Sequence, residues 1–145
     1  MKKVYAIKDI DSVVEEVFLP KLKKYTIFTF QGPLGAGKTT LIKRVLAKSG
    51  VKEIVTSPTF NYLNKYHGNF GMIFNHFDLY RITSLDGFLE LGFDEYLYQN
   101  KVINLIEWPL VIEDLLDSED LKSKVCNIKL SYDPKNLSIR VLETK

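Results

Sequence analysis

The chain has one cysteine, Cys126, in 145 residues, and this scarcity excludes several classes of protein. A lone cysteine forms no disulfide within the chain and has no second thiol with which to build a zinc cluster. We therefore exclude a disulfide-stabilised secreted domain and expect Cys126 to be a buried thiol in a reducing, cytoplasmic compartment. Long apolar runs are missing too. None approaches the length of about 18 residues that a transmembrane helix needs, so no membrane contact is expected.

The chain also has little net charge. Its 20 basic residues are nearly balanced by 18 acidic residues, which gives a formal net charge of +2. This balance offers no electrostatic reason to expect direct binding to nucleic acid or to a membrane surface. A hydrophobic content of 46% is typical of a globular fold, and the length matches one domain. We therefore expect a single domain over residues 1–145.

The most informative segment present is the run Gly-Pro-Leu-Gly-Ala-Gly-Lys-Thr at residues 32–39. It matches the phosphate-binding P-loop pattern G-x-x-x-x-G-K-[ST]. Backbone N–H groups of such a loop converge on phosphate oxygens, and the lysine brings a positive charge to the β- and γ-phosphates. The hydroxyl that follows the lysine, here Thr39, is a ligand for Mg²⁺. The predicted nucleotide contacts are Gly32, Leu34, Gly35, Ala36, Gly37, Lys38, Thr39 and Thr40.

The segments on both sides of this loop support the interpretation. Residues 25–30 are a β-branched and aromatic run typical of a buried strand, and residues 39–48 have apolar side chains at helical spacing. Farther along, residues 61–67 and 72–77 are joined by a turn too short for a crossover helix, which predicts an antiparallel hairpin. We expect an α/β P-loop NTPase fold of three layers, with a mixed sheet that has a parallel core plus an antiparallel hairpin.

Smaller expectations concern the segments around this core. Ser12 begins a capping-box pattern that predicts the start of a helix, and Pro20 is expected to kink or end that helix. Residues 53–56 are expected to form a short strand. The alternating segments 126–132 and 137–141, joined by a turn, predict a second hairpin.

A P-loop site also needs an acid that positions Mg²⁺ and its waters, and such acids follow apolar strands. Residues 102–106 lead to Glu107, and residues 72–77 lead to Asp78. Because the carboxyl ends of parallel strands face the nucleotide, both acids are candidates. We favour Glu107 for the metal because its strand is the more uniformly apolar, which leaves Asp78 to orient or deprotonate the attacking water. The reverse division stays open. The predicted catalytic residues are Lys38, Asp78 and Glu107.

Four other side chains each have two interpretations. Thr59 follows a proline-stiffened turn, so it belongs either to a switch segment that reaches Mg²⁺ and the γ-phosphate or to a plain connector. Arg81 either stabilises phosphate charge or pairs with an acid. His76 lies in an aromatic strand, which favours a core histidine over a catalytic one. Trp108 either packs against the strand end or lines the nucleotide pocket.

Many protein families share the P-loop, and other motifs narrow the choice. A Ras-like GTPase needs D-x-x-G, yet no Asp in the chain is followed by Gly at the third position. It also needs N-K-x-D, and the segment at residues 64–67 lacks the final Asp. A guanine-specific switch is therefore disfavoured. A small-molecule kinase usually carries an Arg-rich lid, and residues 81–100 contain only Arg81, which disfavours a kinase without excluding it.

Four blocks of sequence together resemble one family. They are GPLGAGKTT at residues 32–40, SPTF at 57–60, HFDLYR at 76–81 and LIEWP at 105–109. Their order and spacing are similar to those of the bacterial TsaE (YjeE) family, and the resemblance extends from Thr26 to Val111. The first block is shared by many families, whereas the other three in this order are specific.

The resemblance implies an ATPase that is required for making threonylcarbamoyladenosine beside the anticodon of tRNA. It implies ATP and Mg²⁺ as ligands and TsaB and TsaD as partners, where TsaD carries out the transfer onto tRNA and ATP hydrolysis resets the complex between turnovers. Contact with tRNA is then indirect, through the complex, and hydrolysis by the chain alone is expected to be weak and partner-stimulated. A nucleotide-gated binding module, in which ATP occupancy controls docking, is the alternative.

Carried over by position, the resemblance assigns phosphate contact to Lys38, the Mg²⁺ shell to Thr39 and Glu107, and the catalytic acid to Asp78. It places Thr59 in a switch-like block.

The resemblance also makes residues 8–11 a candidate for adenine contact. The chain departs from the family at Pro33, where an acidic residue is common. Because proline has no N–H, the other loop amides must supply the phosphate contacts.

Overall fold

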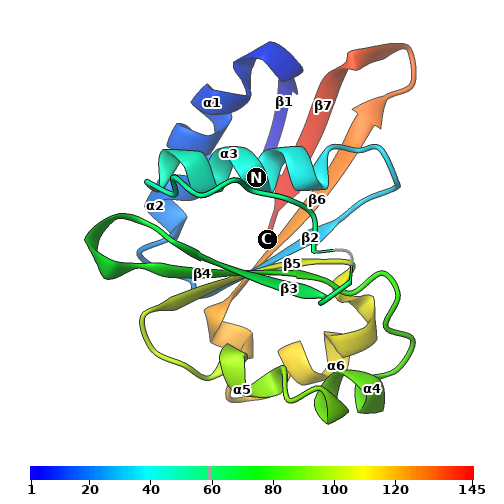
Figure 1. Cartoon of the computed structure of the whole chain (residues 1–145). Coiled ribbons are helices and arrows are strands. Elements are labelled where there is room, and N and C mark those ends of the chain that lie inside the picture. The colour runs from blue at the N-terminus through cyan, green and yellow to red at the C-terminus, as the bar shows by residue number, and fades with distance from the viewer. Residues whose placement is uncertain (59) are drawn as a thin grey trace.

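A mixed β-sheet forms the centre of the computed structural model, which describes residues 1–58 and 60–145 (Figure 1). Its strands are β1 (Lys2–Ala6), β2 (Ile27–Gln31), β3 (Leu63–His67), β4 (Ile73–Asp78), β5 (Val102–Glu107), β6 (Val125–Asp133) and β7 (Asn136–Thr144). Over the described residues these seven strands have the order β1-β7-β6-β2-β5-β4-β3. The central strands β6, β2, β5 and β4 are parallel, while β7 pairs antiparallel with β6 and β3 pairs antiparallel with β4. The predicted parallel core and both predicted hairpins are therefore confirmed.

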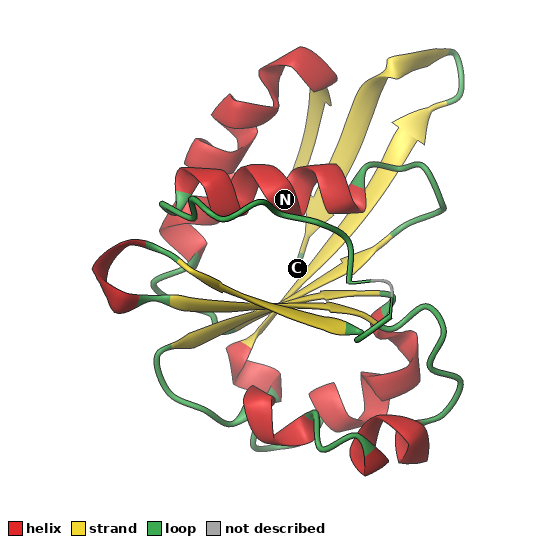
Figure 2. Cartoon of the chain, in the orientation of Figure 1, coloured by secondary structure: helices red, strands yellow, loops and turns green. Residues whose placement is uncertain are grey.

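Helices cover both faces of this sheet (Figure 2). The α-helical segments are α1 (Ile10–Val13), α2 (Leu19–Lys21), α3 (Lys38–Lys48), α4 (Leu85–Glu90), α5 (Asp94–Leu97) and α6 (Glu113–Leu116). Short 3₁₀ turns lie at Ile7–Asp9, Asn69–Gly71, Pro109–Ile112 and Lys122–Lys124. The first three α-helical segments cover one face and the last three cover the other, which is the predicted three-layer arrangement. No helix within residues 1–58 and 60–145 is long and apolar enough to cross a bilayer.

Each face of the sheet has its own hydrophobic core. The alternation of side chains along β2 sends Phe28 and Phe30 to the face under α3 and Ile27 to the opposite face. The first core contains Leu41 and Val45 of α3, and the second contains buried residues of α4, α5 and α6. Because both faces of the central strands are covered, these strands are apolar on both sides, as the run at residues 25–30 indicated.

The first helix corrects one expectation and agrees with another. It begins at Ile10, directly after a 3₁₀ turn, so Ser12 lies inside the helix and is not its cap. The expectation for Pro20 is confirmed to within one residue, because the helix ends at Lys21 after a π-helical turn over Val14–Phe18. A proline ring crowds the carbonyl four residues earlier and removes one N–H donor, and a wider π turn accommodates both effects without breaking the helix.

The strand expected at residues 53–56 is wrong. These four residues form no strand and are attached to the edge strand β3 mainly through side chains. A carboxylate oxygen of Glu53 accepts a hydrogen bond from the backbone N–H of His67 at 3.2 Å. The hydroxyl of Tyr66 donates to the carbonyl of Thr56 at 3.2 Å. The segment therefore covers part of the edge of the sheet without extending it.

The P-loop between β2 and α3 lies against the neighbouring strand β6. Gly32, its first residue, has a φ of +153°. A Cβ atom placed on Gly32 would lie 2.1 Å from the carbonyl oxygen of Leu130 in β6. This close approach explains why the loop begins with glycine, since any side chain would push the loop away from the sheet.

We predict that Gly32→Ala lowers the free energy of unfolding by about 2 kcal/mol or more, because the new methyl group meets a backbone carbonyl that cannot move without displacing β6. Gly35→Ala is the matched control. Its φ of +78° makes alanine unfavourable, but a Cβ there meets no atom within 4 Å. It should cost only about 1 kcal/mol of backbone strain. Urea unfolding of the two variants compares these costs, and equal losses would contradict the packing argument.

Candidate functional site

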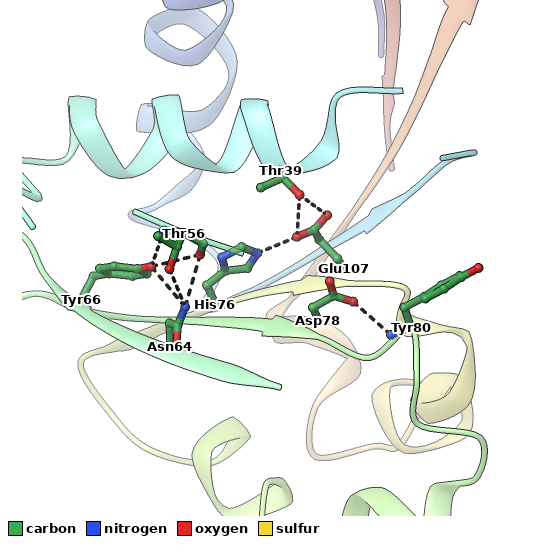
Figure 3. Close-up of polar contacts among 8 residues, drawn as sticks. All are labelled: Thr39, Thr56, Asn64, Tyr66, His76, Asp78, Tyr80 and Glu107. Carbon is green, nitrogen blue, oxygen red and sulfur yellow. Dashed lines mark hydrogen bonds and ion pairs between the residues drawn. The ribbon is translucent and has the colours of Figure 1, made fainter. Parts of the chain in front are cut away.

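The P-loop and both predicted acids lie at one edge of the sheet (Figure 3). β2 ends at Gln31, directly before the loop, and the parallel strands β4 and β5 end at Asp78 and Glu107. The register of β4 and β5 places Asp78 directly beside Glu107. Parallel strands present their carboxyl ends at the same edge of a sheet, so the topology alone brings these three parts of the chain together.

Glu107 connects the start of α3 with β4. The hydroxyl of Thr39 lies 2.9 Å and 3.1 Å from the two carboxylate oxygens of Glu107 and donates to them. On its other side, Nε2 of His76 lies 2.6 Å from Oε2 of Glu107. Since the carboxylate only accepts, Nε2 is the donor. The predicted pair of metal ligands, Thr39 and Glu107, is therefore already in contact.

His76 belongs to the site as well as to the core. Its side chain is fully buried, as the aromatic strand indicated, but it does not serve packing alone because it holds the carboxylate of Glu107. Its second ring nitrogen, Nδ1, has no hydrogen-bond partner among the described residues. The HFD block at residues 76–78 was the signal for this role, because alternation along β4 sends His76 and Asp78 to the same face.

The ammonium group of Lys38 lies against the backbone at the start of the loop. This group donates to the carbonyl oxygens of Gly32 at 2.6 Å and Pro33 at 3.0 Å. It also lies 4.0 Å from the centre of the Trp108 ring, which is a cation–π contact. Burial lowers the pKa of Lys38, and the negative charges of Glu107 and Asp78 partly oppose that shift.

Trp108 has an unusual backbone conformation for a bulky residue. Its φ of 56° and ψ of 58° are left-handed, and its indole ring lies 4.9 Å from the ring of Tyr80. Left-handed backbone at a residue other than glycine costs free energy and is often found at functional sites. Of the two interpretations of Trp108, the structure therefore favours a residue that lines the site, because the ring covers Lys38.

Asp78 is half-buried and is held by its own turn. Its Oδ1 accepts a hydrogen bond from the backbone N–H of Tyr80 at 3.0 Å. Burial raises the pKa of Asp78; the N–H of Tyr80 opposes this shift, and the negative charge of Glu107 adds to it. Asp78 also borders a pocket of about 100 Å³ whose lining includes Pro58, Tyr62, Tyr80 and Arg81. Arg81 forms no ion pair within residues 1–58 and 60–145, so the structure does not support its pairing with an acid.

The remaining predicted residues lie on the loop, at the start of α3 and in the N-terminal segment. Leu34, Gly35 and Thr40 are exposed on the loop and the first turn of α3, and Ala36 is buried beneath them. Asp11, in the segment considered for adenine contact, is engaged by Arg44 of α3 through two hydrogen bonds of 2.7 Å and 2.9 Å. Thr59 lies outside the described residues, so both of its interpretations stay predictions.

A larger cavity borders this edge through Gln31 and Pro109. It has a volume of about 480 Å³, and its lining includes Thr29, Asn127, Glu113 and Lys145. None of the predicted site residues lines it. The larger of the two cavities therefore does not mark the site that the loop and its acids form.

Arg140 of β7 is a neighbour of the loop that the sequence pattern did not identify. Its Nε donates to the carbonyl oxygen of Ala36 at 3.0 Å, across a separation of 104 residues in the chain. No short motif contains both residues, so only the pairing of β1, β7 and β6 brings this arginine to the loop.

The residues present fit a nucleotide phosphate with a magnesium ion. Mg²⁺ is usually held by one or two carboxylates and by substrate phosphates, with waters completing its shell, so a cage of protein ligands is not needed. The hydroxyl of Thr39 and the carboxylate of Glu107 are hard oxygen donors of this kind. Residues 1–58 and 60–145 contain no cluster of three or more His, Cys, Asp or Glu side chains that could hold a metal.

The raised pKa of Asp78 predicts a specific dependence of stability on pH. The folded state holds the Asp78 proton above the ordinary aspartate pKa of 3.8, so this residue's contribution to stability is lost as pH rises past that value. Asp78→Asn removes the titration and keeps an oxygen that accepts from Tyr80. We expect the variant to match the wild type near pH 3.5 and to exceed its free energy of unfolding by up to about 1 kcal/mol at pH 7. Urea titrations at both pH values measure this, and a variant less stable at pH 7 would contradict it.

Comparison with known proteins agrees with this geometry. The family model described as "Threonylcarbamoyl adenosine biosynthesis protein TsaE" matches residues 6–137. A protein named tRNA threonylcarbamoyladenosine biosynthesis protein TsaE from Rickettsia typhi is 36% identical over 125 residues, covering 79% of this chain and 84% of the relative. Its namesake from Treponema pallidum is 39% identical over 87 residues, covering 60% of this chain and 62% of the relative. That match therefore spans less than two thirds of the Treponema protein.

The fold has a solved counterpart. The crystal structure of YdiB from Bacillus subtilis superposes with a TM-score of 0.64 at 27% sequence identity, covering 98% of this chain and 82% of that one. The family model includes the P-loop, the HFD block and Glu107, which are the same parts that meet at the carboxyl edge of the sheet. On this evidence the chain belongs to the TsaE family.

Proposed function

We propose that this chain is the ATP-binding and ATP-hydrolysing subunit of the machinery that makes threonylcarbamoyladenosine next to the anticodon of tRNA. The contact between Thr39 and Glu107 is the observation that carries the proposal. It brings a P-loop hydroxyl and a strand-end carboxylate within 2.9 Å of each other, so the two protein ligands of a Mg²⁺–nucleotide complex are already assembled.

The remaining residues supply the other parts of phosphoryl transfer. Lys38 carries a positive charge that moves from the carbonyls of Gly32 and Pro33 to the β- and γ-phosphates. Bound Mg²⁺ would neutralise charge on the phosphate oxygens. Asp78, with its raised pKa, is a stronger base than an ordinary aspartate and lies beside Glu107, so it orients or deprotonates the attacking water. His76 keeps Glu107 oriented toward Thr39.

The segment after β4 favours hydrolysis over transfer to a small molecule. A kinase lid must close over its substrate, yet Phe88 of α4 and Leu97 of α5 are buried in the second core. This packing holds the segment against the face of the sheet that lies away from α3 (Figure 1). The sequence of residues 81–100 also contains a single arginine, Arg81, where a kinase lid is usually rich in arginine.

We further propose that the protein acts in the cytoplasm with TsaB and TsaD, and that hydrolysis resets their complex between turnovers. The names of the relatives support a role in this modification. The net charge of +2 gives no reason to expect direct tRNA binding. In this proposal the contact with tRNA is indirect, through TsaB and TsaD. In this proposal, hydrolysis by the chain alone is weak and is stimulated by these partners.

We predict that purified chain hydrolyses ATP slowly and that TsaB, TsaD and tRNA together accelerate it. Lys38→Ala should lower this stimulated rate by about 100-fold or more, since it removes a charge that stabilises the transferring phosphoryl group. Glu107→Gln keeps the size of the side chain but removes its charge, so it should raise the Mg²⁺ concentration for half-maximal rate by about 10-fold or more. Glu113→Gln, the same change at an exposed site on α6, is the matched control and should leave both values unchanged.

Phosphate release measured across a Mg²⁺ titration tests these expectations. A rate indifferent to TsaB, TsaD and tRNA would remove the proposed partners and leave a P-loop ATPase with another client. If Glu107→Gln binds ATP, does not hydrolyse it and still supports repeated rounds of modification, nucleotide occupancy alone controls the complex, and the chain acts as a gated binding module.

A further inference from the structure

We propose that Arg140 is a positioning residue for phosphate binding, which fixes the peptide between Ala36 and Gly37 so that its N–H faces the bound phosphate. The inference rests on the proposed nucleotide binding and deepens it. It assigns a role in the P-loop to the last strand of the sheet, outside all four blocks of sequence that characterise the site.

The first step in the argument concerns the peptide itself. The described chain contains no cis peptide bond, so the carbonyl of Ala36 and the N–H of Gly37 point in opposite directions. Arg140 holds that carbonyl toward β7 with a hydrogen bond of 3.0 Å. The N–H of Gly37 is therefore directed away from β7 and is available to a phosphate bound in the loop.

The second step concerns the freedom of this peptide. Gly37 has a φ of +96°, and glycine adopts positive and negative φ about equally well. A peptide next to glycine can therefore turn over at little cost, which would direct the carbonyl of Ala36 toward the phosphate and repel it. The N–H of Ala36 is already used, since it donates to the carbonyl of Pro33 at 3.1 Å. The hydrogen bond from Arg140 is a contact from outside the loop that favours one orientation of this peptide.

The third step concerns how Arg140 is held. Its Nη1 donates to the carbonyl oxygens of Leu137 at 2.5 Å and Ile139 at 3.2 Å, both in β7 itself. Tyr5, its partner in the pairing of β1 with β7, is buried beside it. The guanidinium group therefore bridges the backbone of β7 and the loop, and its planar fork is suited to such simultaneous contacts.

The fourth step concerns its charge. Within residues 1–58 and 60–145, Arg140 makes its hydrogen bonds to carbonyl oxygens and forms no ion pair. Pro33, the loop residue without an N–H, makes each remaining donor more important. An arginine that orients one donor of the loop, with its charge not neutralised by a carboxylate, should strengthen binding of the phosphates rather than of the base.

The test compares two ligands of the full chain. Displacement of a fluorescent ADP analogue gives the affinities of ADP and of inorganic pyrophosphate, which has phosphates but no base or ribose. Arg140→Ala should weaken both by about 10-fold, because the lost contact is a charge-assisted hydrogen bond. Millimolar guanidinium should restore much of the pyrophosphate affinity of this variant. Lys135→Gln removes a positive charge from the exposed tip of the same hairpin and should change neither affinity.

Steady-state hydrolysis supplies a second readout. Arg140→Ala should raise KM for ATP more than it lowers kcat and should leave the Mg²⁺ requirement unchanged. If Arg140→Ala proves poorly folded, Arg140→Lys keeps the charge but cannot span the carbonyls of both Ala36 and Leu137, so an intermediate loss of pyrophosphate affinity is expected.

Three results would overturn the inference. Unchanged affinities in Arg140→Ala would show that the loop keeps its shape alone, and a loss for ADP without a loss for pyrophosphate would assign Arg140 to the base or ribose. Full wild-type affinity in Arg140→Lys would show that a positive charge is enough for phosphate binding and that the planar guanidinium group is not needed. A wild-type chain that binds neither ligand would instead overturn the proposed function itself, and with it this inference.

Discussion

The carboxylate of Glu107 is buried at the end of a central strand, with 3% of the residue exposed, and most of the site depends on how that charge is satisfied. A buried carboxylate is costly unless hydrogen bonds and nearby positive charge compensate for the lost water. Thr39 and His76 supply the hydrogen bonds, and the ammonium group of Lys38 lies close enough to interact with its charge. Because these partners come from α3 and β4, one carboxylate connects the end of β5 to two other elements of the fold.

The shape of the P-loop depends in a similar way on its neighbours. Its glycines allow conformations that other residues avoid, but they do not choose among them. The choice comes from β6, whose carbonyl at Leu130 lies against Gly32, and from β7, whose Arg140 holds Ala36. The C-terminal hairpin therefore contributes to the chemistry of the site, although its sequence is an ordinary alternation of apolar and polar residues.

Sequence patterns predicted the elements of the fold that depend on residues close to one another in the chain. Alternation and turn length predicted the hairpins, and the run of apolar residues before Glu107 predicted the strand that carries it. Contacts between segments that are distant in the chain could not be predicted from local patterns, which is why Arg140 was missed and a core position was favoured for His76 over a catalytic one. The segment at residues 53–56 looked like a strand because its composition suits one, but tertiary packing against β3 decided otherwise.

That same packing has a consequence for how copies of the protein behave in concentrated solution. β3 is the last strand of the sheet, and an open edge offers unpaired backbone groups that can recruit a strand from another molecule. Glu53 occupies one such N–H, at His67, and adds a negative charge at the rim. Strand addition there would have to displace a charged side chain and the segment that carries it. Residues 53–56, which were expected to form a strand, therefore hinder edge-to-edge aggregation through β3.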